Sequence, residues 1–500
     1  MEKLKKNVIA KGAANIYFET TVGIFSGYIL WFLLTKLTTP EVIGTSSTIV
    51  SIAAIFTTVV LIGVNQGVQR FSARSFSEHR LGDTQVIVLS SLVLLSMGIL
   101  FGVIAIIVFK DWIYNVNLDY NLIILSILLV VSSGFATLFR SIMVSFLYTK
   151  SLPRIMVITS LCKIILAIIL VLNGTGPSGI IAAYISTKTM AAVLLAWAVR
   201  IFLKEPKRFS NIKLILHSSR RILIASIASW IPALINVIGI QLGTIIVFGF
   251  EGASKAGIYI IAFSLFSAIA AIINSVFAIA FPALSAMPDG RKRAVCRLIK
   301  ISLVISLPLS SSIVFYSDDI IIILFGKDYV DGSLVLKILL LSILPNTVTL
   351  GINSLVYSYG KYRYLLAIGL CSTIPRTAFS FILVLIYGST GVAIAYTLGA
   401  IMGFIMSIII AKKIGMLIVW RDLGLTLIIP MTIAFAIGNF QSSFILGVPA
   451  TLVLSYGIFL KFHIINRSDI QDFVCFLPNG MTEPIINVIG MIKEKLNRYK

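Results

Sequence analysis

Long apolar runs alternate with short polar segments along most of the 500-residue chain. A membrane-spanning helix needs about 20 apolar residues. The pattern predicts fourteen such helices, with boundaries given to within several residues. They cover approximately residues 13–35, 45–69, 85–109, 121–147, 154–172, 180–203, 222–248, 257–283, 299–317, 333–359, 364–387, 391–411, 421–438 and 444–465. The chain is therefore expected to be an all-α polytopic membrane protein.

The lysines and arginines between these spans predict the orientation of the protein. With the N-terminus placed inside, the inner segments hold 32 basic residues and the outer segments hold only four. Those four are Lys36, Lys110, Lys255 and Lys327. Because cytoplasmic loops collect lysine and arginine, we expect a plasma (inner) membrane protein with both termini in the cytoplasm.

Composition excludes several other classes of protein. The chain is 58% hydrophobic and 12% charged, its mean hydropathy is +1.03 and its net charge is +22. Soluble proteins carry roughly 25% charged residues, and a nucleic-acid binder places its positive charge on a polar surface. We therefore expect no soluble enzyme and no nucleic-acid partner. The four cysteines lack metal or redox spacing and no Walker A motif is present, so no metal site and no cofactor is predicted.

An internal repeat predicts two similar halves. At an offset of 213 residues, Val42-Ile43-Gly44 falls on Lys255-Ala256-Gly257, and at 212 the segment Gly179–Tyr184 falls on Gly391–Tyr396. Six spans per repeat give the halves the same orientation, related by a pseudo-two-fold axis along the membrane normal. The predicted parts are an N-lobe (1–203), a basic cytoplasmic linker (204–221), a C-lobe (222–411), spans 13 and 14 (412–466) and a cytoplasmic amphipathic tail (467–500).

Apart from the charged residues at the span ends that belong with the cytoplasmic segments, six ionisable residues fall inside predicted spans, where charges are costly and mark function by default. They are Glu19, Arg140, Lys163, Lys188, Lys337 and Arg376. Lys337 is close enough to the outer end of its span to extend its amine into the interface. Arg140 and Lys188 could also extend their charged ends to the interface, so this interpretation stays open for both. Lys163 and Arg376 are 213 residues apart, so the repeat places one cation at the same depth in each lobe.

An interior with several cations and one acid indicates an anionic substrate, because phosphate groups match arginine and lysine donors. Arg140, Lys163, Lys188 and Arg376 are the candidate substrate-binding residues. Glu19 has two interpretations. It could form a structural ion pair, or it could couple transport to protons or sodium ions, since a carboxylate at low dielectric beside a cation can titrate near neutrality.

Four short motifs resemble the oligosaccharide flippases of polysaccharide biosynthesis, within the multidrug/oligosaccharidyl-lipid/polysaccharide exporter superfamily. They are the segments Glu251–Tyr259, Leu324–Val330, Tyr359–Lys361 and Tyr387–Ala393. The resemblance implies alternating access by two rocking lobes around a cationic cavity. It implies a polyprenyl-phosphate or pyrophosphate-linked oligosaccharide as substrate, moved from the cytoplasmic to the outer leaflet. Partners would be the lipid bilayer and glycosyltransferases or a polymerase.

Two alternatives remain open at this point. An ion-coupled multidrug exporter of the same superfamily would transport cationic compounds, which the cationic interior disfavours. A membrane-embedded glycosyltransferase would need catalytic acids, and no such pair stands out in the sequence. The preferred interpretation is a flippase that is not an enzyme.

Overall fold

The computed structural model describes residues 2–77, 81–108, 120–146, 148–202, 212–287, 289–417, 420–439, 443–462 and 464. All regular elements in these ranges are helical. The first half contains α1 (Glu2–Leu37), α2 (Pro40–Leu61), α3 (Val64–Ser77), α4 (Leu81–Val108), α6 (Tyr120–Ser145), α7 (Ser151–Leu172) and α8 (Gly176–Phe202). The second half contains α9 (Ile212–Glu251), α10 (Ala253–Ala286), α11 (Arg291–Phe315), α12 (Ser317–Leu324), η1 (Lys327–Tyr329), α13 (Gly332–Leu340), α14 (Ile343–Ser358) and α15 (Tyr362–Lys413). Helices α16 (Trp420–Asn439) and α17 (Phe444–Lys461) complete the described chain.

The helices account for all fourteen predicted spans. Twelve of them are long and apolar enough to cross a membrane, and the pair α13 and α14 forms one further, bent span. Helix α15 contains two spans that meet at Gly388, whose backbone is not helical. The prediction of an all-α, multi-pass membrane protein is therefore confirmed.

Two predicted spans are broken, and two others are joined by a tight turn at a glycine. After α2 the chain adopts left-handed conformations at Ile62 (φ 46°) and Gly63 (φ 73°), so the predicted span 45–69 ends at Leu61 and α3 continues in a new direction. A bend of 45° separates α13 from α14. At Gly388 (φ 57°, ψ −136°) the chain turns back on itself, a conformation that glycine adopts without a steric penalty.

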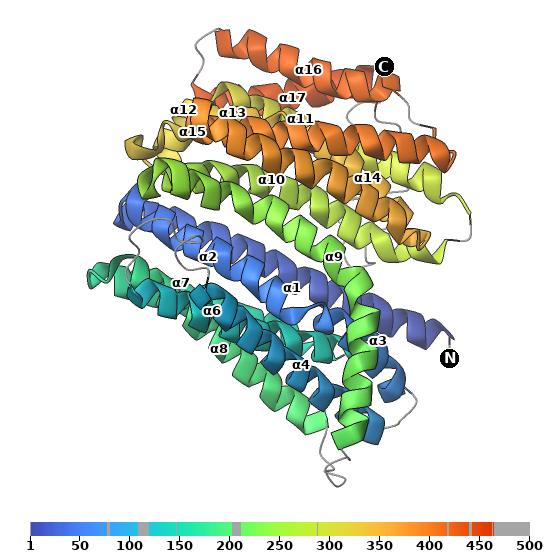
Figure 1. The fold of residues 1–500 in the computed structure, drawn as a ribbon. Helices are drawn as coiled ribbons and strands as arrows, with labels where there is room; N and C mark the ends of the chain where they lie inside the picture. Colours follow the sequence, from blue (N-terminus) through green and yellow to red (C-terminus); the bar gives the residue numbers. More distant parts are fainter. Residues whose placement is uncertain are drawn as a thin grey trace.

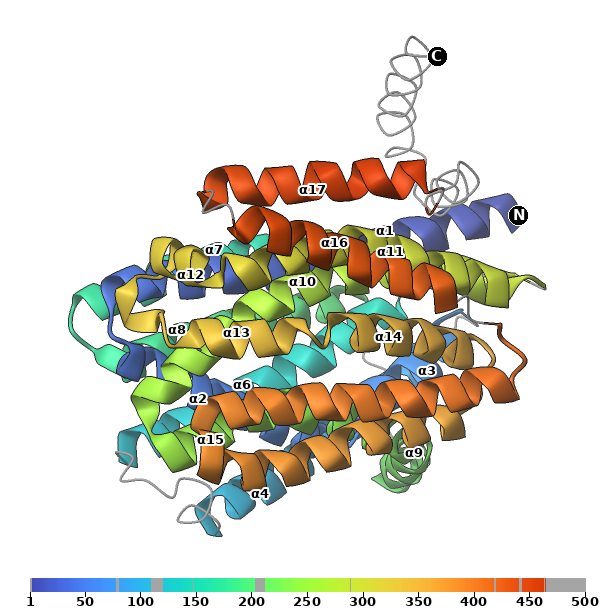
Figure 2. The same cartoon turned by 90° about the horizontal axis from the view of Figure 1, so that it is seen from above.

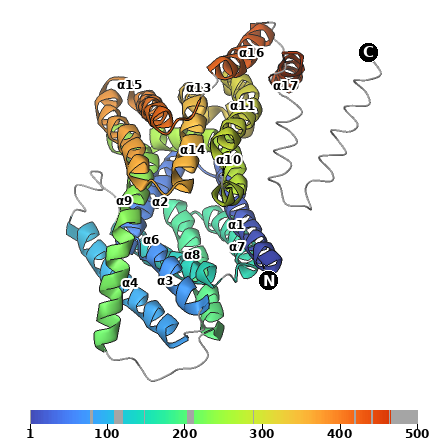
Figure 3. The same cartoon turned by 90° about the vertical axis from the view of Figure 1, so that its right-hand side faces the viewer.

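The first and second halves form two groups of helices, and α9 passes from one to the other (Figures 1 and 3). In the first half, α1 packs on α7 and α6 on α8. In the second half, α9 packs on α15 and α14 on α15. Helix α9 also packs on α2, α3 and α4. Helices α16 and α17 lie outside this arrangement, and both pack against α11 (Figure 2).

The halves meet most closely where the starts of α2 and α10 cross. A Cβ atom on Gly44 would overlap the carbonyl oxygen of Ala253, and one on Gly257 would overlap that of Pro40. Gly44 and Gly257 are repeat equivalents, as are Pro40 and Ala253, so each half makes the same contact to the other. A reciprocal contact of this kind is expected on a two-fold axis. It supports the predicted lobe relationship, which otherwise stays a prediction.

Two predicted segments differ from the structure or lie beyond it. The linker predicted at 204–221 is helical from Ile212 onward, because α9 begins there and continues into the span. Residues 203–211 and the predicted amphipathic tail at 467–500 lie outside the described residues.

Candidate functional site

Arg376 lies between the two arms of α15 and the facing side of α9. Its guanidinium carbon is 4.0 Å from the centre of the Tyr396 ring, and its Nη1 donates a hydrogen bond of 3.0 Å to the carbonyl oxygen of Gly239. The Nε atom is buried and has no hydrogen-bond partner among the described residues. An unpaired buried donor is costly, typically about 1–3 kcal/mol, so this group is poised to bind an acceptor.

Glycines provide the space that Arg376 occupies. A Cβ on Gly399, in the second arm of α15, would lie 2.6 Å from the Cβ of Arg376. A Cβ on Gly239 would lie 3.3 Å from Nη1. The small residues that the sequence places on α9 therefore bring its backbone close enough to orient the guanidinium.

Arg376 lies on the wall of a large cavity among the described residues, which has a volume of about 1080 Å³. Helices α3, α9, α10, α14 and α15 form the walls. At one end are the exposed side chains of Arg70, Tyr357 and Tyr362, next to loops predicted to be cytoplasmic. At the other end are Arg376 and Tyr396. The lining contains two arginines and no aspartate or glutamate, so the cavity favours an anionic ligand.

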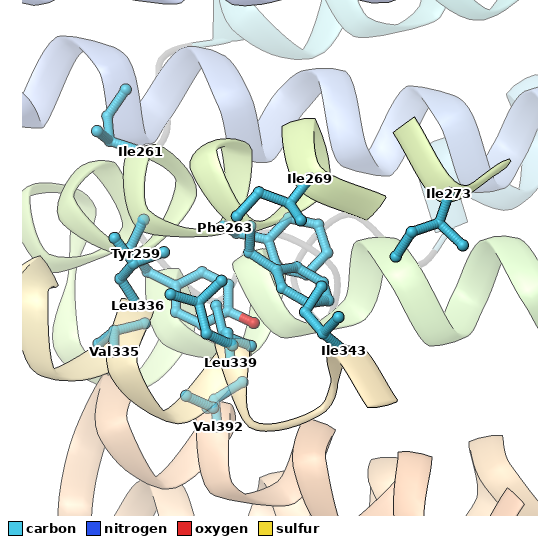
Figure 4. Close-up of a cluster of buried hydrophobic side chains, with 14 of the residues drawn as sticks. Tyr259, Ile261, Phe263, Ile269, Ile273, Val335, Leu336, Leu339, Ile343 and Val392 are labelled. Carbon is cyan, nitrogen blue, oxygen red and sulfur yellow. The ribbon is translucent and has the colours of Figure 1, made fainter. Parts of the chain in front are cut away.

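Packed aromatic side chains close the cavity toward the predicted outer face. Tyr259 stacks on Phe263 with ring centres 6.0 Å apart, and Phe263 and Phe266 contact the edge of Tyr396 at 5.6 and 5.3 Å. Leu336, Leu339 and Val392 pack around this group (Figure 4). Together with the crossing at Gly44 and Gly257, this core separates the cavity from the opposite side of the protein.

A second charged group lies in the first half of the chain. Arg140 on α6 binds the carboxylate of Glu19 on α1 in a bidentate manner, with Nε to Oε1 at 2.6 Å and Nη2 to Oε2 at 2.8 Å. The Glu19 side chain is 9% exposed and that of Arg140 is 35% exposed. Lys188 on α8 interacts electrostatically with both residues and with Lys163.

Lys163 repeats the arrangement of Arg376. Its ammonium lies 5.1 Å from the centre of the Tyr184 ring. Lys163 is equivalent to Arg376 at the offset of 213, and Tyr184 is equivalent to Tyr396 at 212. Each half thus holds a cation against a tyrosine ring at the same place, although Lys163 is only 8% exposed and does not line the cavity.

The structure therefore divides the five candidate residues between two places. It brings Glu19, Arg140, Lys163 and Lys188 together in the first half, and it places Arg376 alone on the cavity wall. Sequence reasoning missed Tyr184 and Tyr396 as partners of the cations, although the repeat already aligned them. It also missed the amide side chains on the cavity wall, which a search for polar residues within apolar spans would have found.

Comparisons with known proteins identify the family and the fold of the chain. The family model described as "Polysaccharide biosynthesis protein" matches residues 33–334. The structure resembles that of the lipid II flippase MurJ in an inward closed conformation, with a TM-score of 0.68, 16% identity, and coverage of 89% of this chain and 99% of that one. It also resembles a multidrug resistance MATE family transporter in an inward-facing conformation, with a TM-score of 0.60, 15% identity, and coverage of 81% and 97%. An outward-facing MATE structure matches with a TM-score of 0.56, 16% identity, and coverage of 81% and 95%.

No curated protein matches the sequence. At these identities the structural similarities show the fold, which this chain shares with a flippase and with multidrug transporters. The family model covers more than half of the chain. The protein therefore belongs to the polysaccharide biosynthesis protein family of multi-pass membrane proteins.

Proposed function

We propose that the protein is a flippase for a polyprenyl-phosphate or pyrophosphate-linked oligosaccharide, acting in cell-surface polysaccharide or glycan assembly. It moves its substrate from the cytoplasmic to the outer leaflet of the plasma (inner) membrane, with both termini in the cytoplasm. The observation that carries this proposal is the cavity, which has arginines at both ends, no acid among the described residues of its walls, and its exposed end beside the predicted cytoplasmic loops.

Arg376 is the proposed anchor for the phosphate. Its guanidinium is already held by the Tyr396 ring and the Gly239 carbonyl, and its Nε has no partner. Hydrogen bonds between a guanidinium and a phosphate are charge-assisted and stronger than neutral ones. A ligand phosphate therefore gains a preorganised donor at the closed end of the cavity.

Alternating access would require the crossing of α2 and α10 to open. In the described conformation Gly44 and Gly257 close the predicted outer side. Rocking of the two halves about the cytoplasmic contacts of α9 would separate this crossing and close the opposite end. The same substrate would then face the outer leaflet.

Glu19 is the proposed coupling residue, with a proton or sodium ion as the coupling ion. Its carboxylate holds Arg140 in a bidentate pair beside Lys188 and Lys163. Protonation of Glu19 would release Arg140 and leave three cations near one another. These three cations would then attract the phosphate. We therefore propose that Arg140, Lys163 and Lys188 bind the substrate in the state in which the Glu19–Arg140 ion pair is broken.

Reconstitution into liposomes with a labelled lipid-linked oligosaccharide tests the proposal. We expect Arg376→Ala to lower the translocation rate roughly tenfold or more, because it removes charged hydrogen bonds worth about 1.5–3 kcal/mol each. Arg376→Lys should retain part of the rate. Lys255→Met is the matched control, since Lys255 pairs with Asp331 away from the cavity. A wild-type rate in Arg376→Ala would remove this residue from the mechanism.

The second candidate function is an ion-coupled multidrug exporter, favoured by the similarity to MATE transporters and by the buried Glu19. Such a protein would export cationic dyes from cells and lose this export in Glu19→Gln. The absence of acidic residues from the lining of the described cavity favours the flippase.

A further inference from the structure

Amide side chains from four helices converge on the cavity. They are Gln66, Gln69, Asn236, Asn274, Asn346 and Asn353. Four of the six are asparagines within membrane spans, where an amide without a polar partner is costly. Asn236 on α9 and Asn274 on α10 are exposed, and both line the cavity. The middle of the cavity is therefore a polar but uncharged surface.

The amides follow a regular stripe on α14. Asn346, Leu350, Asn353 and Tyr357 are spaced by four, three and four residues, which places them on one face of the helix. All four line the cavity. At its cytoplasmic end the stripe reaches Tyr357, which packs edge-to-face on Tyr362 with ring centres 5.5 Å apart.

Three polar atoms on these walls are buried and have no hydrogen-bond partner among the described residues. They are the Oε1 atom of Gln66, the Oγ1 atom of Thr349 and the Oδ1 atom of Asn353. Buried polar groups are normally hydrogen-bonded, so each such exception calls for an explanation. Hydroxyl groups of a bound ligand would supply donors to all three after small side-chain rotations.

We propose that the six amides and the two tyrosines at the cavity mouth form a glycan subsite separate from the cationic end at Arg376. The glycan it selects is uncharged and rich in hydroxyl and acetamido groups. Amides both donate and accept hydrogen bonds, as these groups do, and the only charged side chains in the described lining are Arg70 and Arg376, at the two ends of the cavity. This inference rests on the proposed function and adds the chemical class of the sugar.

Binding to the full-length wild-type protein in nanodiscs gives the first test. The probes are undecaprenyl pyrophosphate alone, the same lipid bearing a disaccharide of N-acetylglucosamine, and the same lipid bearing a glucuronate-containing disaccharide. We expect the neutral glycan to improve affinity about tenfold over the bare lipid, as one or two net hydrogen bonds would. The acidic glycan should bind more weakly than the neutral one. Equal affinity for the bare and neutral-glycan lipids, or preference for the acidic glycan, would overturn the inference.

Variants then locate the subsite. Asn353→Leu and Gln66→Leu should each weaken binding of the neutral glycan lipid about tenfold and change binding of the bare lipid less than twofold. Leu350→Met is the control, because Leu350 lies between Asn346 and Asn353 on the same stripe and the change preserves volume. Equal losses for both lipids would contradict a separate glycan subsite. If the wild type binds none of the three lipids, the proposed function itself is wrong.

Discussion

The two cation–tyrosine pairs occupy equivalent positions in the two halves but have different surroundings. Lys163 lies against Tyr184, is almost completely buried and neighbours Lys188, itself beside the Glu19–Arg140 pair. Arg376 lies against Tyr396 and borders a cavity of about 1080 Å³ whose described wall residues include no acid. The repeat has thus kept the local geometry, while the neighbouring residues have diverged.

This difference indicates a division of tasks between the halves. A cation without a carboxylate partner can bind an external anion, whereas a paired set of charges can respond to protonation of its one acid. Substitutions at equivalent positions of the two halves should therefore have equal effects where the contacts are reciprocal, and different effects where the charges differ. Three predictions test this expectation, and the first concerns a reciprocal contact.

The largest effect is expected at the crossing of α2 and α10. Gly44→Ala and Gly257→Ala each place a methyl group against the backbone of the other half, at positions where it would overlap a carbonyl oxygen. Each should lower the free energy of unfolding by about 1–3 kcal/mol, and the two values should be equal because the contact is reciprocal. Thermal unfolding in detergent measures both.

Gly249→Ala is the control for these variants, since no atom lies within 4 Å of a Cβ placed there. It should be neutral or slightly stabilising, because alanine favours helix over glycine. A loss at Gly44 without a loss at Gly257 would contradict a two-fold relationship at this crossing.

The second prediction compares the loss of a charged residue in the first half with the loss of one in the second half. Glu19→Gln leaves Arg140 unpaired beside Lys188, and should lower the free energy of unfolding by about 1–2 kcal/mol, less than the 3–5 kcal/mol of a fully buried pair because Arg140 is one third exposed. Arg376→Gln should cost less stability, since no carboxylate lines the described cavity with it.

A double-mutant cycle on Glu19 and Arg140 provides the control. Because the two residues share their hydrogen bonds, the double variant Glu19→Gln/Arg140→Gln should lose less stability than the sum of the single variants. Strictly additive losses would show that the pair is not a unit. Translocation assayed with and without a pH gradient should also lose its pH dependence in Glu19→Gln.

The sequence predicted the spans and the repeat because both depend on local, one-dimensional patterns. Apolar runs specify helices in a bilayer, and the offset of 213 already paired Lys163 with Arg376. The break after α2 was missed because Ile62 adopts a left-handed conformation that a β-branched residue rarely takes. Only Gly63 marks the position in the sequence, and glycine is also frequent in membrane-spanning helices that continue unbroken.

The site was harder to predict than the fold, because it depends on which helices face one another. The sequence proposed both Lys163 and Arg376 as substrate-binding residues at the same depth in the two lobes, yet of these two only Arg376 borders the cavity. The amides of this cavity come from α3, α9, α10 and α14, which are separated by up to 287 residues, from Gln66 to Asn353. Their convergence is a consequence of helix packing, and single-span patterns do not contain it.

The smallest effect is expected at the predicted outer end of the second half, where Asp318 and Lys337 form an ion pair of 2.9 Å. Their repeat equivalents, Ala105 and Ile124, cannot form one. Burial alone would raise the pKa of Asp318, but hydrogen bonds from Ser333 and Lys337 and the charge of Lys337 lower it below 3.8. The stabilisation is therefore complete above that pH and is lost as the pH falls below it.

Because Asp318 is half exposed, Asp318→Asn should cost less than about 1 kcal/mol at pH 7 and should match the wild type in strong acid. A constant difference across this range, measured by unfolding at several pH values, would mean that the ion pair does not stabilise this end of the protein.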